Sequence, residues 1–475
     1  MSPILIIAVP LLIAFLTVVM KKQALPLLWL TLAFNLVVTL TSDFGIHVIG
    51  GFKPPFGISL RLDSYSFMAL IVVQGILLFT TFIAKDKIKN DATVVMILLA
   101  GINGMLLTND LFNLFVMIEV VSIAAFILSR LNNKLVDTIH YIVIASVGSV
   151  FFLMGTVMVY GLTGSLQIEA MFKLLASVSD GKVYIAMLLL LVGLSVELKL
   201  MPVGSWAKGI YGNANAFTGA LFASVLAPTF AFVFGRLTQE VIVLNDATGY
   251  LLMTIAIATL ILGELAAYKQ VNLRKMLAFS SIAQSGLVVL LFMFNLTFPA
   301  ILLIINHALA KSILFWIAGK LSESYQTDDG DQLKGVFYHH KLLGMIFSIA
   351  TLSMMGMPLF FGFFAKVNTV VGAFTVGWIG LPIIIVTIAV VEVAYFMRWL
   401  LLLWSPAKEG QLAKDGIAIE KSSMFSVNEV IAIVLVALTL FVIGLTPVVV
   451  NDYVEDAVLA VGSSQSILIG EGGAK

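Results

Sequence analysis

The 475-residue sequence contains no cysteine. Disulfide bonds and cysteine-ligated iron–sulfur clusters are therefore excluded, because both need thiol sulfur. We expect no cofactor or metal on this chain. Any iron–sulfur or other redox centre that acts together with this chain is expected on a partner subunit.

Charged residues are also scarce. They make up 11% of the chain, against about 25% in soluble domains. Hydrophobic residues make up 60%, and the mean hydropathy is +1.08. These values exclude a soluble globular protein. The first apolar run has no basic residue before it, and Lys21 and Lys22 follow it. It is therefore interpreted as a retained helix and not a cleaved signal.

Long apolar runs, bounded by charges or by Gly/Pro clusters, predict an all-α polytopic membrane protein of about fourteen spans. The spans are expected at residues 3–20, 24–41, 64–84, 93–108, 110–130, 138–160, 183–203, 214–236, 249–268, 277–294, 298–319, 342–372, 378–404 and 428–446. An even number of spans puts both termini on the same side.

The loop charges indicate which side that is. Most lysines and arginines fall in the loops that start at Lys21 and Lys22. The other set of loops is poor in them: Lys53, Arg61, Lys173, Lys182, Arg236 and Lys475. Because cytoplasmic loops carry the excess of positive charge, both termini are expected outside a cell (inner) membrane.

Several titratable side chains lie inside the predicted spans. A charge at the bilayer centre costs at least about 2.5–3.5 kcal/mol, so such residues are functional candidates by default. Glu119 stands alone in an apolar run, and the others are Lys199, Lys366, His307, Lys311, Glu197 and Glu392. The pattern favours a protein that moves protons or cations.

Two spans are interrupted, the seventh at Pro202 and Gly204 and the twelfth at Gly356 and Pro358. Broken helices in matching positions of two halves point to a transport site. The pairing fits an inverted five-helix repeat, spans four to eight and nine to thirteen. The expected divisions are 1–90 for the first three helices with an external hairpin, 91–237 and 238–404 for the repeats, and 405–475 for a cytoplasmic loop, helix 14 and tail.

Six stretches, in order, resemble the antiporter-like subunits of respiratory complex I, membrane-bound hydrogenases and Mrp-type cation/proton antiporters. They are GGFKPPFGISLRLDSYSFM, TNDLFNLFVMIE, YIVIASVGSVFFLMGTVMVYGLTGSL, VNLRKMLAFSSIAQSGLV, NHALAKSILFWIAGKL and GMPLFFGFFAK. The likeness is greatest to D-type Mrp, H-type hydrogenase, and M- and N-type complex I subunits. It implies fourteen helices in two inverted five-helix bundles.

The resemblance also implies roles. Glu119 matches the carboxylate of the fifth helix, Lys199 its partner lysine, and Lys366 the terminal lysine. His307 and Lys311 match the relay pair of the eleventh helix. We hypothesise that a proton loads at Glu119 and Lys199 and passes through His307 and Lys311, by waters, to Lys366.

The chain departs from the family pattern in three places. The usual lysine register falls on Glu197, about 200° from Lys199 on an ideal helix. Either the break turns Lys199 inward or Glu197 shares its role. The eighth span, ASVLAPTFAF, has Pro228 but no titratable group, and Gln284 stands where histidine is common. Glu197, Glu392 and Gln284 are secondary relay candidates.

The leading hypothesis is an ion-translocating subunit of a multi-subunit respiratory or Mrp-type complex, with related antiporter-like subunits as partners. It would handle protons, or protons and sodium, with no catalytic chemistry of its own and no nucleic acid. Two alternatives remain: a non-conducting structural subunit and a free-standing secondary transporter.

Four local expectations complete the analysis. Residues 50–63 predict an extended hairpin. Residues 166–177 predict an amphipathic surface helix. The acidic and histidine-containing loop SESYQTDDGDQLKGVFYHHK is expected to be solvated or to dock a partner. Glu264, close to Lys269, is expected at the membrane interface.

Overall fold

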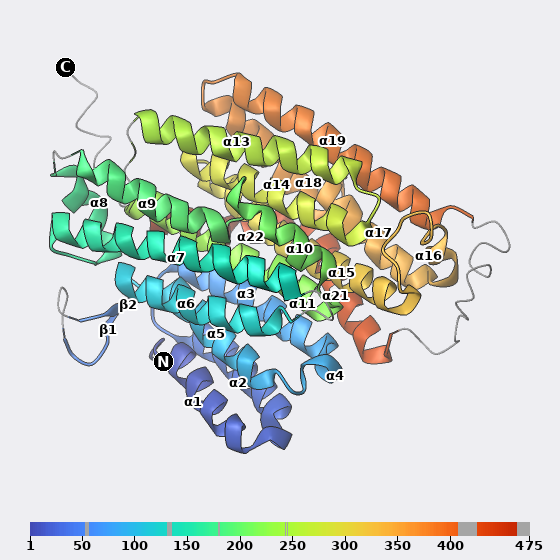
Figure 1. Ribbon diagram of the computed structural model, residues 1–475, viewed down its shortest axis with the longest axis horizontal. Helices are drawn as coiled ribbons and strands as arrows, with labels where there is room; N and C mark the ends of the chain where they lie inside the picture. The colour runs from blue at the N-terminus through green and yellow to red at the C-terminus, as the bar shows by residue number, and fades with distance from the viewer. Residues whose placement is uncertain are drawn as a thin grey trace.

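The computed structural model describes residues 1–52, 57–130, 135–178, 181–242, 244, 246–406 and 425–462. Helices run side by side through one bundle (Figure 1). A two-stranded hairpin and α8 lie at one end of it, here called the hairpin face, and α16 lies at the other, the loop face. Ten helices in the described part of the chain are long and apolar enough to cross a membrane. The expected helical, polytopic membrane protein is confirmed at this level.

The N-terminal part leads into the hairpin and back. Its elements are α1 (Leu5–Val19), η1 (Lys21–Gln23), α2 (Ala24–Thr41), β1 (Gly45–Val48), β2 (Ser59–Leu62), α3 (Ser64–Ile83) and α4 (Lys85–Ile88). The strands pair antiparallel, with Gly45 opposite Leu62. The expected hairpin exists, but its first strand precedes the segment named from the sequence, and residues 53–56 lie outside the described residues.

The middle of the chain holds the first interrupted helix. Its elements are α5 (Ala92–Leu107), α6 (Leu111–Leu128), α7 (Leu135–Thr163), α8 (Ile168–Ala176), α9 (Lys182–Glu197), η2 (Val203–Ser205), α10 (Trp206–Asn213), α11 (Ala216–Leu221), η3 (Phe222–Leu226) and α12 (Ala227–Glu240). The amphipathic helix expected at 166–177 is α8, whose buried residues Ile168, Met171 and Leu175 share one side.

The C-terminal part holds the second interrupted helix. Its elements are α13 (Asp246–Lys269), α14 (Leu273–Met293), α15 (Thr297–Tyr325), α16 (Val336–His339), α17 (Lys341–Met355), α18 (Phe361–Thr375), α19 (Gly380–Trp404), α21 (Val427–Leu445) and α22 (Pro447–Gly462). The sequence reasoning assigned residues 447–462 to a tail and did not expect α22. This helix packs against α3, and the Arg61 guanidinium donates a hydrogen bond to the Ala460 carbonyl at 3.1 Å.

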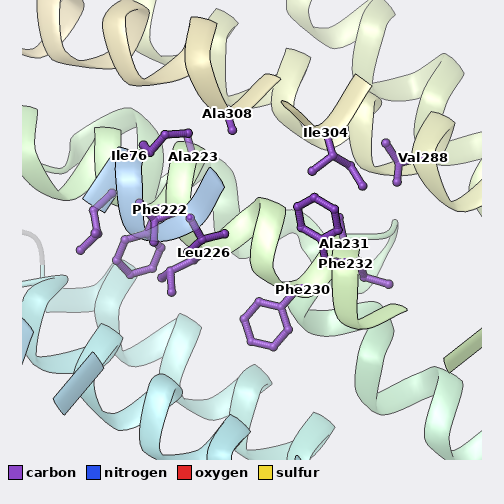
Figure 2. Packing of buried hydrophobic residues seen from close by; sticks show 14 of the residues in the cluster. Ile76, Phe222, Ala223, Leu226, Phe230, Ala231, Phe232, Val288, Ile304 and Ala308 are labelled. Atoms are coloured by element: carbon purple, nitrogen blue, oxygen red, sulfur yellow. The ribbon is translucent and has the colours of Figure 1, made fainter. Parts of the chain in front are cut away.

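The core centres on α15, which is buried along most of its length. Side chains of η3 and α12 pack toward Ile304 and Ala308 of α15 and Val288 of α14 (Figure 2). The η3 segment is a single π-helical turn that ends two residues before Pro228. Such turns occur often at functional sites, because they redirect side chains and carbonyls within a helix.

The first interruption separates α9 from α10 and includes Pro202 and Gly204. Lys199 has a positive φ of 60°, which ends the α9 geometry. The Gly204 amide then donates a hydrogen bond to the Leu200 carbonyl at 2.7 Å. A Cβ on Gly204 would lie 2.0 Å from the Lys199 carbonyl oxygen, so the tight turn requires glycine here.

The second interruption separates α17 from α18 and includes Gly356 and Pro358. Gly356 ends α17 in the left-handed region at a φ of 76°. The Ser353 hydroxyl donates to Asn306 of α15 at 2.7 Å and accepts from the Gly362 amide at 3.1 Å. One hydroxyl therefore ties both sides of the interruption to the central helix.

Replacing Gly362 with alanine should destabilise this junction. The new Cβ would lie 1.7 Å from the Ser353 carbonyl oxygen, and overpacking of this kind costs roughly 1–3 kcal/mol. Thermal unfolding in detergent measures the loss. Gly75→Ala in α3 is the control, because no described atom would lie within 4 Å of its Cβ. Equal unfolding temperatures for Gly362→Ala and wild type would contradict the prediction.

Candidate functional site

Titratable side chains from several helices lie in the interior of the bundle. The first group joins α6, α7 and α9. The half-buried Glu119 carboxylate accepts a hydrogen bond from Ser149 of α7. Glu197, 8% exposed, accepts one from Ser122 of α6 at 3.4 Å. The two carboxylates interact electrostatically with each other.

Lys199 lies next to this group, at the end of α9. It is 1% exposed, so it does not reach either surface of the described chain. Its ammonium group lies 5.6 Å from the centre of the Tyr211 ring, a cation–π distance. Glu197 is the carboxylate that acts on it electrostatically, and Glu197 in turn feels Glu119. Glu197 thus links Glu119 to Lys199.

The break in the helix explains how both Glu197 and Lys199 can face the interior. The 200° separation of Glu197 and Lys199 assumes an unbroken helix, but α9 ends at Glu197 and Lys199 adopts a left-handed backbone. Both side chains are consequently buried on the interior side. The structure places Glu197 in the same interior group as Glu119 and Lys199, the two residues that the family resemblance named.

A small cavity lies beside His307 and beside Leu198, the neighbour of Lys199 in the chain. Its lining includes Leu198, Pro228, Gln284 and His307, and it offers about 20 Å³ to a water molecule, enough for roughly one. His307 interacts electrostatically with both Lys199 and Lys311. Its Nδ1 has no hydrogen-bond partner among the described residues. The absence of a titratable group around Pro228 is therefore offset by a small cavity whose mostly apolar wall carries Gln284 and His307.

Lys311 lies one turn from His307 on α15 and is fully buried. Its ammonium group donates to the Leu277 carbonyl at 3.1 Å and to the Ser280 hydroxyl, both on α14. The rings of Phe315 and Phe396 lie 5.8 and 5.6 Å away. Its direct partners are neutral, so no carboxylate of the described chain compensates its charge by contact.

Lys366, unlike Lys199 and Lys311, forms an ion pair. It lies on α18 after the second interruption, and its ammonium contacts the Glu392 carboxylate of α19 at 2.6 Å. Glu392 also acts electrostatically on Lys311. Arg398, six residues after Glu392 on α19, donates to the Gln270 carbonyl at 2.8 Å. The pair connects the terminal lysine to the centre of the bundle.

Glu264 corrects an expectation. It is 3% exposed and lies in the interior, where it interacts with Glu392, Lys366 and Lys311. The exposed Lys269 follows it by five positions, which puts the two about 140° apart around the helix. The buried residues of α13, such as Ala256, Leu260 and Ala267, recur at helical spacing with it. That periodicity is the signal that could have placed Glu264 correctly.

The hairpin face holds a buried ionic cluster that the sequence reasoning missed. Arg236 contacts Asp63 at 2.7 Å, and Arg61 contacts Glu240 at 2.8 Å. The Arg236 guanidinium also lies over the Tyr65 ring at 5.1 Å. Burial by itself would raise the pKa of Asp63, but the Arg236 and Arg61 charges outweigh it and hold that pKa well below its usual value.

The loop between α15 and α16 is anchored to the bundle. Arg274 donates to Asp328 of this loop at 2.6 Å, and Glu323, in the last turn of α15, pairs with Lys87. In the part of the chain that the structure describes, no group of three histidine, aspartate or glutamate side chains could hold a metal ion.

The arrangement matches one known family. The description "NADH:quinone oxidoreductase/Mrp antiporter, TM" fits residues 108–391. The chain belongs to this family. The resemblance drawn from the six sequence stretches is thereby confirmed, and the chain is an antiporter-like membrane subunit of the Mrp and complex I type.

Individual relatives agree with this assignment. An N-type subunit of NADH-quinone oxidoreductase from Desulforudis audaxviator is 28% identical over 83% of this chain and 85% of its own length. A D-type subunit of the Na(+)/H(+) antiporter from Alkalihalophilus pseudofirmus is 29% identical over 70% of each chain. A chain of the archaeal membrane-bound sulfane sulfur reductase superposes with a TM-score of 0.87, at 26% identity and 98% coverage of both chains.

The hairpin-face cluster generates a stability prediction. Asp63→Asn removes the carboxylate that contacts both Arg236 and Arg61 and leaves these two arginines with Glu240 as their one carboxylate in the cluster. Breaking a buried ion pair in this way costs about 3–5 kcal/mol. Because the folded-state pKa of Asp63 is depressed, its contribution is complete above the unfolded value near 3.9 and falls only at lower pH. Wild type and Asp63→Asn should therefore differ equally in thermal unfolding at pH 8, 6.5 and 5. A difference that shrinks between pH 8 and 5 would refute this.

Proposed function

We propose that this chain is an ion-translocating subunit that moves protons, or exchanges them for sodium, through its buried acids, lysines and histidine. The observation that supports it is that each buried group of the series interacts with the next one. Glu119, Glu197 and Lys199 interact in sequence, His307 interacts with Lys199 and Lys311, and Lys311 interacts with Glu392, the partner of Lys366. A proton can then move in steps between neighbouring groups.

The chemistry of each step follows from desolvation. A buried ammonium without a contacting carboxylate is destabilised, so it gives up a proton readily when a neighbour gains positive charge. In this scheme Glu197 takes a proton from Glu119 and passes it to Lys199. The cavity beside His307 holds the water that carries it on to Lys311. Release from Lys366 requires the Lys366–Glu392 pair to open.

The proposed membrane topology has fourteen crossings. Each interrupted pair, α9 with α10 and α17 with α18, would make one crossing, and the shorter apolar helices α1 and α5 would each make another. Spans four to eight (91–237) and nine to thirteen (238–404) would form inverted repeats, preceded by 1–90 and followed by 405–475. The loop charges then place the hairpin face and both termini outside a cell (inner) membrane.

We further propose that the chain works inside a multi-subunit membrane complex. The relatives named above are subunits of NADH-quinone oxidoreductase and of a Na(+)/H(+) antiporter. Partners would include related antiporter-like subunits, and redox centres, where the complex has them, would lie on other chains. A purely structural role is disfavoured, because packing alone does not call for a series of costly buried charges.

Translocation should depend on Glu197 as strongly as on Glu119. Glu197→Gln and Glu119→Gln each remove one proton-binding group and are expected to slow proton movement about tenfold or more, a barrier increase of about 1.4 kcal/mol. Proton flux into vesicles that contain the assembled complex measures this. Glu169→Gln, a glutamate exposed on α8, should behave like wild type. Undiminished flux in both interior variants would overturn the proposed function.

A further inference from the structure

A second cavity lies at the loop face, where α13 and α19 end beside the loop between α15 and α16. Residues of all three segments line it, among them Asp329, Asp331, Arg398 and Trp399. It offers about 170 Å³ to water, against about 20 Å³ for the cavity beside His307. One water molecule needs roughly 10–15 Å³ of such space, so this cavity has room for a larger polar group.

Backbone contacts hold this cavity in shape. The Gly330 amide donates a hydrogen bond to the Val271 carbonyl at 2.9 Å, and the Leu273 amide donates to the Asp328 carbonyl at 2.9 Å. A Cβ on Gly330 would lie 3.0 Å from the Trp399 ring, so the loop rests directly on α19. The cavity is therefore part of the packed fold.

Charges of both signs line the cavity without contacting each other. Arg398 uses one of its five N–H donors on the Gln270 carbonyl and lies over the Tyr268 ring at 5.5 Å. The Asp329 carboxylate accepts a hydrogen bond from the Asp331 amide at 2.9 Å. No residue of the described chain forms an ion pair with Asp329, Asp331 or Arg398. A ligand that carries both charges would satisfy both sides.

The cavity also lies where lipid headgroups are expected. α13 and α19 lie side by side along one edge of the bundle (Figure 1), and both are long and apolar enough to cross a membrane. Tyr268, near the end of α13, is a residue type that favours the membrane–water interface. On α19, the exposed residues Val386, Val390 and Ala394 recur every four positions and lead to Arg398. An acyl chain along this apolar stripe would bring its headgroup to Arg398.

We propose that this cavity binds the headgroup of an ethanolamine phospholipid, with its phosphate on Arg398 and its ammonium on Asp329 and Asp331. A guanidinium group suits phosphate, because its N–H donors match the phosphate oxygens. A primary ammonium donates three hydrogen bonds that carboxylates accept, whereas the quaternary ammonium of a choline headgroup donates none. An anionic headgroup would face two carboxylates without an ammonium. This binding depends on the membrane position of the chain and not on ion translocation, so it is independent of the proposed function.

Native mass spectrometry of the purified full chain, with the subunits that accompany it, tests this selectivity. The delipidated protein is given equal amounts of dioleoyl phosphatidylethanolamine, phosphatidylcholine and phosphatidylglycerol. We expect this chain to retain phosphatidylethanolamine about tenfold more than either of the other two lipids.

Two sets of variants separate the two ends of the headgroup. Arg398→Gln should lower the retention of phosphatidylethanolamine and phosphatidylcholine alike, because both carry the phosphate. Asp329→Asn combined with Asp331→Asn should lower phosphatidylethanolamine to the level of phosphatidylcholine and leave phosphatidylcholine unchanged. Lys269→Gln and Asp86→Asn are the matched controls, because they remove exposed charges outside the cavity wall, and both should behave like wild type.

Three results would overturn the proposal. The first is equal retention of phosphatidylethanolamine and phosphatidylcholine by wild type, or a preference that the double aspartate variant keeps. The second is displacement of the lipid by free phosphoethanolamine at the same concentration, because the ligand would then be a soluble zwitterion. The third is loss of an accompanying subunit from Arg398→Gln with lipid retention unchanged, which would assign the cavity to a partner chain.

Discussion

The exclusion of water from buried ammonium groups governs the interior of the bundle. Lys199 and Lys311 cannot be solvated, so each needs protein oxygen or an aromatic ring nearby. For Lys199, the early end of α9 and the turn at Gly204 bring the ammonium group near the Tyr211 ring. For Lys311, α14 supplies the Leu277 carbonyl and the Ser280 hydroxyl. The first interruption and the packing of α15 against α14 therefore both stabilise a buried lysine.

The same exclusion explains why the interior charges form a series and not isolated pairs. Lys366 and Glu392 are in direct contact, whereas Lys199, Lys311 and Glu264 lack a contacting partner of opposite charge among the described residues. Directly paired groups hold their protons firmly, and groups that interact over a longer distance exchange them more easily. In the proposed function, the Lys366–Glu392 pair would therefore hold a proton, and the lysines without a contacting carboxylate would release one.

The hairpin face uses charge differently. Arg61, Asp63, Arg236 and Glu240 contact one another directly, and Arg61 also binds the Ala460 carbonyl of α22. These contacts fasten the hairpin, α12 and the C-terminal helix together. The sequence reasoning counted Arg61 and Arg236 only as loop charges, because residues 173 positions apart give no local sign that Asp63 and Arg236 will meet.

Local sequence is enough to place the chain in a membrane, to locate most of its helices and to name the titratable residues inside them. Those properties follow from transfer free energy and helical periodicity, which act within one segment. The packed fold was needed to show that Glu197 links Glu119 to Lys199, that Glu392 pairs with Lys366, and that Glu264 is buried in the interior. Such pairings depend on how helices distant in sequence pack. They also depend on the helix breaks, across which the regular period of 3.6 residues per turn does not hold.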